Sequence, residues 1–418
     1  MKVKGVSLIL LLMIVAYPLR GYYQFIPSVK YTYGNNLYDF SSLMDDEEGY
    51  GELILKFWWK QKKGNFLFRG DMYGSILLNG NGKLYRNTSP FQHMWRYTPP
   101  ELSRGNSLDI KLAVGELSFG LKKSRLEAYV GLIPFTQSLL SFSDSLFGTL
   151  LKYGIVKSEG KKLLMGFAWG GYLARSADER RWILEATPAP TGWGFPFPDH
   201  SALFLWVGAE GENFKSRFFF SENSDSLKNS GFTGVFFKKN TAIDVEYVVS
   251  RSSLSRGDAF LISGKVGNDK NFIKAGYVDV SGYDYTIVGN EKQSAFQCME
   301  AFPPAGKILL PYLRNLPPLI LTFVDGELNK GSFGVRLSAF RYAASGYSKP
   351  FSSYLGTEVD SGLSFDGGFY FLKLDYSLLF SGEGLKEIVS DYLTENRLQS
   401  NFSVRRTTLL SVEGGVRF

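Results

Sequence analysis

The chain has 418 residues, with 47 lysines and arginines against 40 acidic residues and a single cysteine, which gives a formal net charge of +7. One cysteine excludes an intrachain disulfide, and the small charge excess without a basic stripe argues against a nucleic-acid partner. Aromatic residues make up 16% of the chain, yet beyond the N-terminus no apolar run is long enough for a membrane-spanning helix. This combination favours a membrane β-barrel, which carries aromatic girdles.

The first 21 residues are predicted to be a signal peptide. Two lysines precede an apolar run from residue 6 to residue 16, which is too short to span a membrane and suits secretion. Cleavage is expected after Gly21 or after Ala16, and an N-terminal membrane anchor is the alternative. The remaining residues, 22–418, are predicted to form one barrel domain whose net charge is +4 because three basic residues are removed.

Alternation of apolar and polar residues with period two predicts β-strands along most of the mature chain. The alternation is clearest in "ELILKFWW" (52–59), "RLEAYVGL" (125–132), "AIDVEYVV" (242–249) and "YFLKLDYSLLF" (370–380). In the second of these, the residues expected to face lipid are Leu126, Ala128, Val130 and Leu132. The apolar parity switches near Gly115, which predicts a β-bulge at that position.

Short and long connections between these strands alternate. The tight turns, such as "KQKKGN" (60–65) and "FDGG" (365–368), are rich in residues that close hairpins. The other connections, such as 134–148, 174–200 and 282–316, are longer. We therefore predict an all-β fold, a transmembrane antiparallel barrel of about 18 strands with short periplasmic turns and long extracellular loops. A 16-strand barrel and a large soluble β-sandwich or propeller are the alternatives.

The chain ends in "FSVRRTTLLSVEGGVRF" (402–418), a long alternating stretch whose last residue is aromatic. It resembles the C-terminal signal of Gram-negative outer-membrane β-barrel proteins at Leu410, Val412, Val416 and Phe418. Gly414 departs from that pattern, which prefers a larger residue there. The resemblance implies recognition by the barrel assembly machinery, pairing of the last strand with the first, and an outer-membrane location among lipid and lipopolysaccharide.

The segment "PFTQSLLSFSDSLFG" (134–148) is the candidate constriction of the pore. It resembles the third loop of bacterial porins, which folds into the lumen, and its spacing of glycine and proline resembles the phosphate-selective and alginate-export porin families. The resemblance implies that the narrowest part is lined by Gln137, Ser141, Ser143, Asp144 and Ser145. An ordinary external loop is the alternative.

Parity along the strands places charges of both signs on the lumen wall. The wall candidates are Arg69, Asp71, Arg125, Glu127, Lys215, Arg217, Arg336, Lys373 and Asp375. If the loop folds inward, Asp144 is expected near Arg125 or Arg69. Many of these charges are expected to pair across strands, so the sequence predicts weak charge selectivity.

Two loops, 180–200 and 297–318, are too apolar and proline-rich for freely solvated segments. Their aromatic residues either stack against sugars or pack together as a cap; they are Trp182, Trp193, Phe195, Phe197 and Tyr312. The acidic run "DDEE" (45–48) is either simply solvated or bridges divalent cations to lipopolysaccharide.

The predicted function is that of a porin, passive diffusion of small hydrophilic solutes such as ions or sugars, because 16 to 18 strands leave an aqueous channel. One alternative is a barrel plugged by loops 174–200 and 282–316 that binds surface polysaccharide or assists capsule export. A barrel hydrolase using His93 is a further alternative. We predict no enzyme activity, cofactor or metal site, and a monomer and a homotrimer are both open.

Overall fold

The computed structural model describes residues 22–35, 48–80, 95–97, 110–158, 160–172, 200–252, 256–281, 296, 304–308, 319–345, 354–385 and 406–418. The predicted signal peptide lies outside these residues, as does most of the acidic run. Among the described residues, no helix has the length and apolar character needed to cross a membrane.

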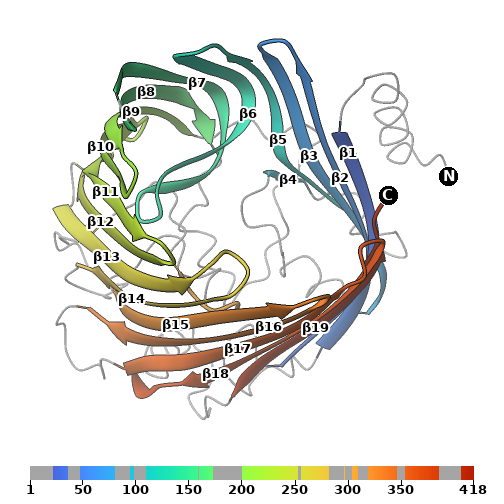
Figure 1. Ribbon diagram of the computed structural model, residues 1–418. Helices are drawn as coiled ribbons and strands as arrows, with labels where there is room; N and C mark the ends of the chain where they lie inside the picture. The colour runs from blue at the N-terminus through green and yellow to red at the C-terminus, as the bar shows by residue number, and fades with distance from the viewer. Residues whose placement is uncertain are drawn as a thin grey trace.

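The described strands form one antiparallel sheet that closes on itself (Figure 1). They are β1 (Tyr22–Asn35), β2 (Glu48–Lys63), β3 (Phe66–Gly80), β4 (Trp95–Tyr97), β5 (Ile110–Lys122), β6 (Leu126–Ser138), β7 (Phe142–Ser158), β8 (Lys161–Tyr172), β9 (His200–Glu210), β10 (Phe214–Asn223), β11 (Lys228–Lys238), β12 (Thr241–Arg251), β13 (Arg256–Gly267), β14 (Phe272–Val280), β15 (Leu319–Lys330), β16 (Phe333–Ala344), β17 (Tyr354–Asp366), β18 (Tyr370–Ser381) and β19 (Thr407–Val416). β3 pairs directly with β5, so the wall has the predicted 18 strands, and the short β4 adds to the edge of β5.

The last strand closes the barrel against the first. β19 pairs with β1, and Phe418 continues the pairing beyond β19 by exchanging backbone hydrogen bonds with Phe25 at 2.9 and 3.1 Å. The ring of Phe418 stacks on Phe25 at 6.4 Å and meets Phe369 edge-on at 5.4 Å. Closure leaves no open strand edge between β19 and β1, which lipid would not tolerate. The role of this strand as an assembly signal stays a prediction.

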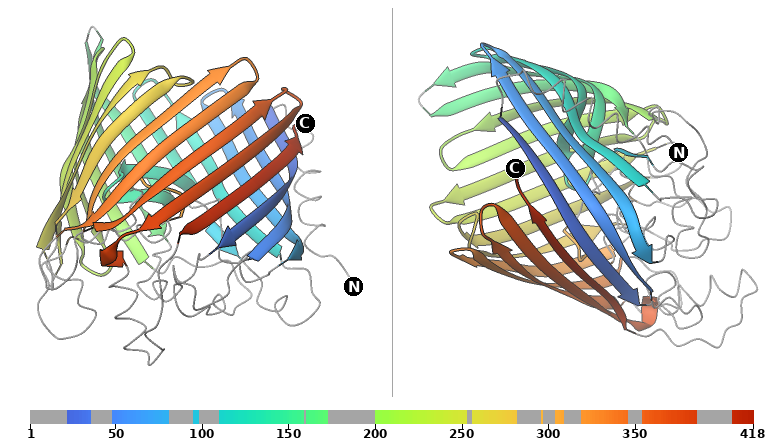
Figure 2. Two further views of the ribbon diagram at one scale, coloured as in Figure 1. Left: turned by 90° about the horizontal axis from the view of Figure 1, so that it is seen from below. Right: turned by 90° about the vertical axis from the view of Figure 1, so that its right-hand side faces the viewer.

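The two rims of the barrel differ. Short hairpin turns and both ends of the described chain lie at one rim, which the asymmetry rule assigns to the periplasm (Figure 2). The opposite rim carries the long connections between β8 and β9 and between β14 and β15. The connections 224–227 and 252–255 at that rim are short as well, so the asymmetry is less complete than predicted.

Side chains alternate between the outer and the inner face of the barrel as predicted. On β18, Leu372 is 52% exposed on the outer face, whereas the inward Ser377 is 1% exposed. The predicted bulge is also present, because Asp71 faces Glu116 and Met72 faces Val114, which leaves Gly115 unpaired in the ladder. Period two is a local property of an extended chain, and for this reason the sequence predicts these faces well.

The interior differs from the predicted polar lumen. A buried apolar cluster extends through the interior from β6 to β18, and includes Phe204 of β9, Leu261 of β13 and Phe340 of β16. Leu132, predicted to face lipid, is only 5% exposed, because β6 leaves the wall at this level. Part of this cluster lies where the β6–β7 hairpin folds inward and packs against β8 and β9.

Candidate pore constriction

The β6–β7 hairpin folds away from the wall into the barrel (Figure 1). Both strands extend through the predicted loop, so residues 134–148 form a hairpin with its turn at 139–141. Gly131, Gly148 and Gly170 are register partners on β6, β7 and β8. Gly131 has a φ of 121°, and a Cβ at either of the other two would overlap the facing backbone. This glycine row allows the close approach at which the hairpin bends inward.

Aromatic rings fasten the hairpin to the wall. Phe142 lies 4.8 Å from Phe204 of β9 and 5.3 Å from Tyr172 of β8, measured between ring centroids. Phe135 lies 5.0 Å from Phe204 and 5.5 Å from Trp206. Offset and edge-on pairs at these distances are favourable beyond the area that they bury. The side of the hairpin that faces β8 and β9 is therefore packed against aromatic side chains, which hold it in place.

A carboxylate and a guanidinium on the wall hold the tip of the hairpin. Glu246 of β12 accepts hydrogen bonds from the Ser138 hydroxyl at 2.7 Å and from the Leu139 amide at 2.9 Å. Arg217 of β10 donates to the Thr136 carbonyl at 3.2 Å. Hydrogen bonds to ionised groups are stronger than neutral ones. Wall residues thus satisfy backbone groups that a hairpin tip would otherwise present to water.

Four of the five predicted constriction residues are buried. They are Gln137, Ser141, Ser143 and Ser145, each 6% exposed or less. Ser141 accepts a hydrogen bond from Asn229 of β11 at 3.2 Å, and the Ser145 hydroxyl donates to the bulged Gly115 carbonyl at 2.9 Å. Ser141 and Ser145 therefore attach the hairpin to the wall, whereas the sequence predicts that they line the passage. Ser143 shares a hydrogen bond of 3.0 Å with Thr136 across the hairpin.

Asp144 is half-buried, and its Oδ1 accepts a hydrogen bond from the Ser145 amide at 2.7 Å. Arg125, one of its expected neighbours, lies in the turn before β6, at the opposite end of that strand. The hairpin side chains that remain exposed inside the barrel are Pro134 and Thr136. The resemblance to the third loop of porins identifies the segment that folds inward but not its solvent-facing positions.

A second segment, residues 304–308, also lies inside the barrel, against β16 and β17. Its backbone is bound from the wall, since the Gly306 amide donates to the Tyr342 hydroxyl at 2.9 Å and the Ile308 amide donates to Glu358 at 2.5 Å. Tyr342 and Glu358 are both almost fully buried, and the Tyr342 hydroxyl donates to Glu358 at 3.2 Å. A Cβ at Gly306 would overlap the Glu358 carboxyl. The wall and the segment are therefore closely fitted.

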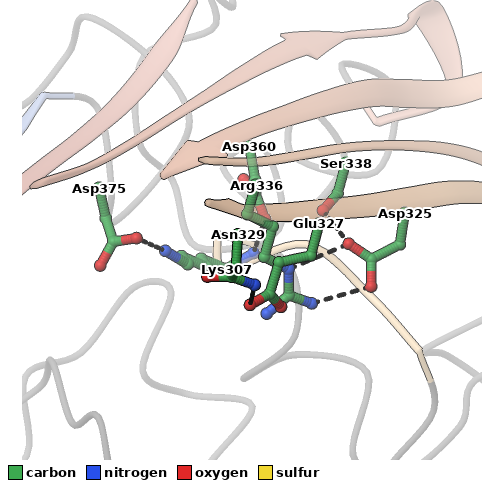
Figure 3. A network of polar contacts seen from close by, with 8 residues as sticks. All are labelled: Lys307, Asp325, Glu327, Asn329, Arg336, Ser338, Asp360 and Asp375. Atoms are coloured by element: carbon green, nitrogen blue, oxygen red, sulfur yellow. Dashed lines mark hydrogen bonds and ion pairs between the residues drawn. The ribbon is translucent and has the colours of Figure 1, made fainter. Parts of the chain in front are cut away.

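Lys307 connects this segment to a network of charged side chains (Figure 3). Its amide donates to Asp360 of β17 at 3.0 Å, and its ammonium lies 2.6 Å from Asp375 of β18. In the same network, Arg336 of β16 donates two hydrogen bonds of 3.0 Å to Asp325 of β15. Two predicted wall residues, Arg336 and Asp375, are thereby placed at the second segment or beside it.

The remaining wall candidates lie nearer the periplasmic rim. Arg69 of β3 pairs with Glu116 of β5 at 3.7 Å, and Asp71 faces Glu116 across the strands. Glu127 pairs with Lys122 at 2.5 Å. Lys215 of β10 and Lys373 of β18 are exposed on the lumen side. The expected cross-strand pairing is therefore present for several of these charges.

Residues that the sequence analysis missed have recognisable patterns. "LFLW" (203–206) is continuously apolar, which is typical of a strand buried on both faces. It indicates that an apolar segment packs against the inner face of β9. The partners of Glu246 and Glu358 have no comparable pattern, because parity gives a residue's face and not its contacts.

The aromatic residues proposed to stack on sugars, Trp182, Trp193, Phe195, Phe197 and Tyr312, lie outside the described residues. His93 does so as well. His200 begins β9, where its Nδ1 lies 2.6 Å from Asp225. Within the described ranges, no serine hydroxyl is hydrogen-bonded to His200, so the arrangement does not form a nucleophile–base pair there.

No protein-family model matches this chain, and no curated protein matches it either. Solved structures do match. OccAB1 of Acinetobacter baumannii has a TM-score of 0.58 at 9% identity, covering 96% of this chain and 97% of that one. OccAB3 of the same organism has a TM-score of 0.55 at 11% identity, with 96% and 99% covered.

The outer membrane protein OprD from Pseudomonas aeruginosa has a TM-score of 0.51 at 9% identity, with 95% of this chain and 93% of that chain covered. Sequence identities this low support a shared fold and no more. The agreement extends over nearly the whole of both chains in each case. This chain therefore has the fold of the outer-membrane porins of the OprD and Occ type.

Proposed function

We propose that the protein is an outer-membrane channel for passive diffusion of small hydrophilic solutes. A closed wall of 18 strands is wide enough to enclose water, and segments that fold inward are needed to narrow it. The β6–β7 hairpin and residues 304–308 are two such segments, held against different parts of the wall. The inward hairpin, clamped by wall side chains, is the observation that carries the proposal. The fold shared with OprD and Occ porins supports it.

The charges inside the barrel favour anions. In several wall ion pairs the cation is the more exposed partner: the side-chain exposure is 34% for Arg69 against 12% for Glu116, and 54% for Arg336 against 14% for Asp325. Water and solutes in the lumen therefore meet the positive partner first. An arginine fork is also suited to carboxylate and phosphate groups. We expect modest anion selectivity, because each cation still has an acidic neighbour.

Single-channel recording in planar bilayers tests this function. Thr136→Trp places a bulky ring on the exposed side of the hairpin and is expected to lower the conductance. Val130→Trp is the matched control, because Val130 lies on the same strand but is 56% exposed on the outer face. The control should conduct like the wild type. Equal conductance in both variants would remove the hairpin from the solute path.

A plugged, ligand-binding barrel is the second candidate function. The buried contacts of Phe296 and Ile308 with the inner apolar cluster favour it, because they show further apolar packing inside the barrel. Such a barrel should add no steady conductance to a bilayer. If the wild-type protein inserted into the bilayer without conducting and also retained a surface polysaccharide on a column, the ligand-binding function would be favoured over the channel.

A further inference from the structure

The outer face of the barrel carries a row of charged residues at the long-loop rim. Glu222 of β10, Lys228 of β11, Arg251 of β12 and Arg256 of β13 are successive register partners across four adjacent strands. Side chains that face each other across a sheet have Cβ atoms roughly 4.5–5.5 Å apart. Three cations therefore lie side by side at this rim.

The row faces lipid and not the lumen. On β12, Val248 and Ser250 are fully buried on the inner side, whereas Tyr247 is 43% exposed on the outer side, and Arg251 shares the parity of Tyr247. On β13, Arg256 shares the parity of the exposed Ile262. Arg251 and Arg256 are themselves exposed and flank the short connection at the rim.

The positive charges of the row are only partly balanced. Lys228 pairs with Glu222 at 3.3 Å. In the described part of the chain, no carboxylate lies within ion-pair distance of Arg251 or Arg256. Asp258 is on the same face one step further from the rim, and its backbone is hydrogen-bonded to Ser281. Like charges directly opposite each other on a sheet are unfavourable, so an anion at this point would stabilise the row.

Apolar side chains lie below the row on the same outer face, four to six residues further from the rim along their strands. Phe218, Tyr247 and Ile262 are 61%, 43% and 40% exposed, and they belong to β10, β12 and β13. A free anion in water would gain nothing from this surface. A lipid would, because its acyl chains would cover these residues while its headgroup reached the rim.

We propose that Lys228, Arg251 and Arg256 form a binding site for a phosphate group of lipopolysaccharide in the outer leaflet. Two guanidinium groups facing each other offer forked donors that match phosphate oxygens, and the neighbouring ammonium adds a third charge. The apolar band below takes the acyl chains. The inference rests on the outer-membrane location in the proposed function, and it does not depend on whether the barrel conducts.

Binding of diphosphorylated lipid A to the purified protein in detergent tests the site. EDTA is present, so that Glu222 and Asp258 cannot bind the lipid through divalent cations. The double variant R251Q/R256Q should bind at least about tenfold more weakly than the wild type, since hydrogen bonds to charged groups are lost. The matched control is R341Q, because Arg341 is an exposed arginine on the outer face of β16 at the same rim, against Tyr354. R341Q should bind like the wild type.

Three further measurements make the result decisive. Lipid A stripped of its phosphates should bind the wild type as weakly as diphosphorylated lipid A binds the double variant, and inorganic phosphate should not compete at equal concentration. R251K/R256K keeps the positive charges without the forked guanidinium donors, so its affinity should lie between those of the wild type and R251Q/R256Q. The proposed site would be overturned by an equal loss of affinity in R341Q and R251Q/R256Q. It would also be overturned if removing the phosphates from lipid A had no effect, or if inorganic phosphate at equal concentration displaced lipid A. Unchanged conductance of R251Q/R256Q would show that the channel function is intact.

Discussion

The two segments that fold into the barrel are held by different forces. The β6–β7 hairpin is attached mainly by aromatic rings, with Phe142 fully buried among Phe135, Tyr172 and Phe204. Residues 304–308 are attached mainly by polar and charged groups of the wall. Salt screens neither the packed rings of the hairpin nor the buried contacts of Glu358 strongly, whereas the half-exposed ion pair between Lys307 and Asp375 weakens as salt screens it. The hairpin is therefore a fixed constriction, whereas the charge balance at the second segment depends on the salt concentration.

Phe142→Ala should produce the largest effect, because it removes the ring at the centre of the hairpin's contacts. Deleting a buried phenyl ring from a packed site costs about 3–5 kcal/mol. We expect a lower denaturant midpoint for unfolding in detergent micelles and a fluctuating conductance in bilayers. Phe147→Ala is the matched control, since Phe147 is on the same strand but 54% exposed on the outer face. If both variants unfolded at the same denaturant concentration, the hairpin would not be anchored by its rings.

Glu246→Gln should have a smaller effect on the same hairpin. The amide keeps one acceptor for Ser138 or Leu139 but loses the charge that strengthens both bonds, which is expected to cost about 1–2 kcal/mol. The tip should then open more often, which would appear as brief excursions to higher conductance. Asp244→Asn on the same face of β12 is the control, because Asp244 pairs with Lys274 at 3.2 Å and not with the hairpin. Flicker of equal frequency in both variants would exclude the clamp.

The sequence predicts the wall much better than the contents of the barrel. Strand faces, the bulge at Gly115 and the strand count follow from period-two patterns and turn residues, which are local properties. Phe418 is found at the closing seam because chain order alone makes the last strand the neighbour of the first. Contacts inside the lumen join residues that are far apart in the chain, so no local pattern encodes them.

The constriction illustrates this limit. The glycines at 131 and 148 and the polar residues between them identify a segment that departs from the wall. They do not reveal that Ser141 and Ser145 are buried while Thr136 stays exposed, because this depends on which strands of the wall the hairpin packs against. The pairing of residues 304–308 with Glu358 lies equally beyond sequence reasoning, since the two are separated by two strands.

Gly306→Ala tests the second segment through its shape. The added methyl group would overlap the Glu358 carboxyl, so the segment must move away from β17. We expect the mean conductance to rise while the stability of the barrel stays close to wild type, because the wall itself is untouched. Gly264→Ala is the control, since a Cβ there meets no atom within 4 Å. An unchanged conductance for Gly306→Ala would mean that this segment lies outside the solute path.

Lys307→Gln should give the smallest effect, confined to ion selectivity. Its side chain is 40% exposed and its ammonium lies 2.6 Å from Asp375, so the substitution leaves one lumen carboxylate without its cation. The net change of one charge should shift the reversal potential toward cations, by about a twofold change in the ratio of chloride to potassium permeability at low salt. Raising the salt concentration should erase the shift, because the Debye length falls to about 3 Å at 1 M. A shift that persisted at 1 M salt would instead indicate a structural movement of the segment, and it would contradict the picture of a constriction held by screened charges.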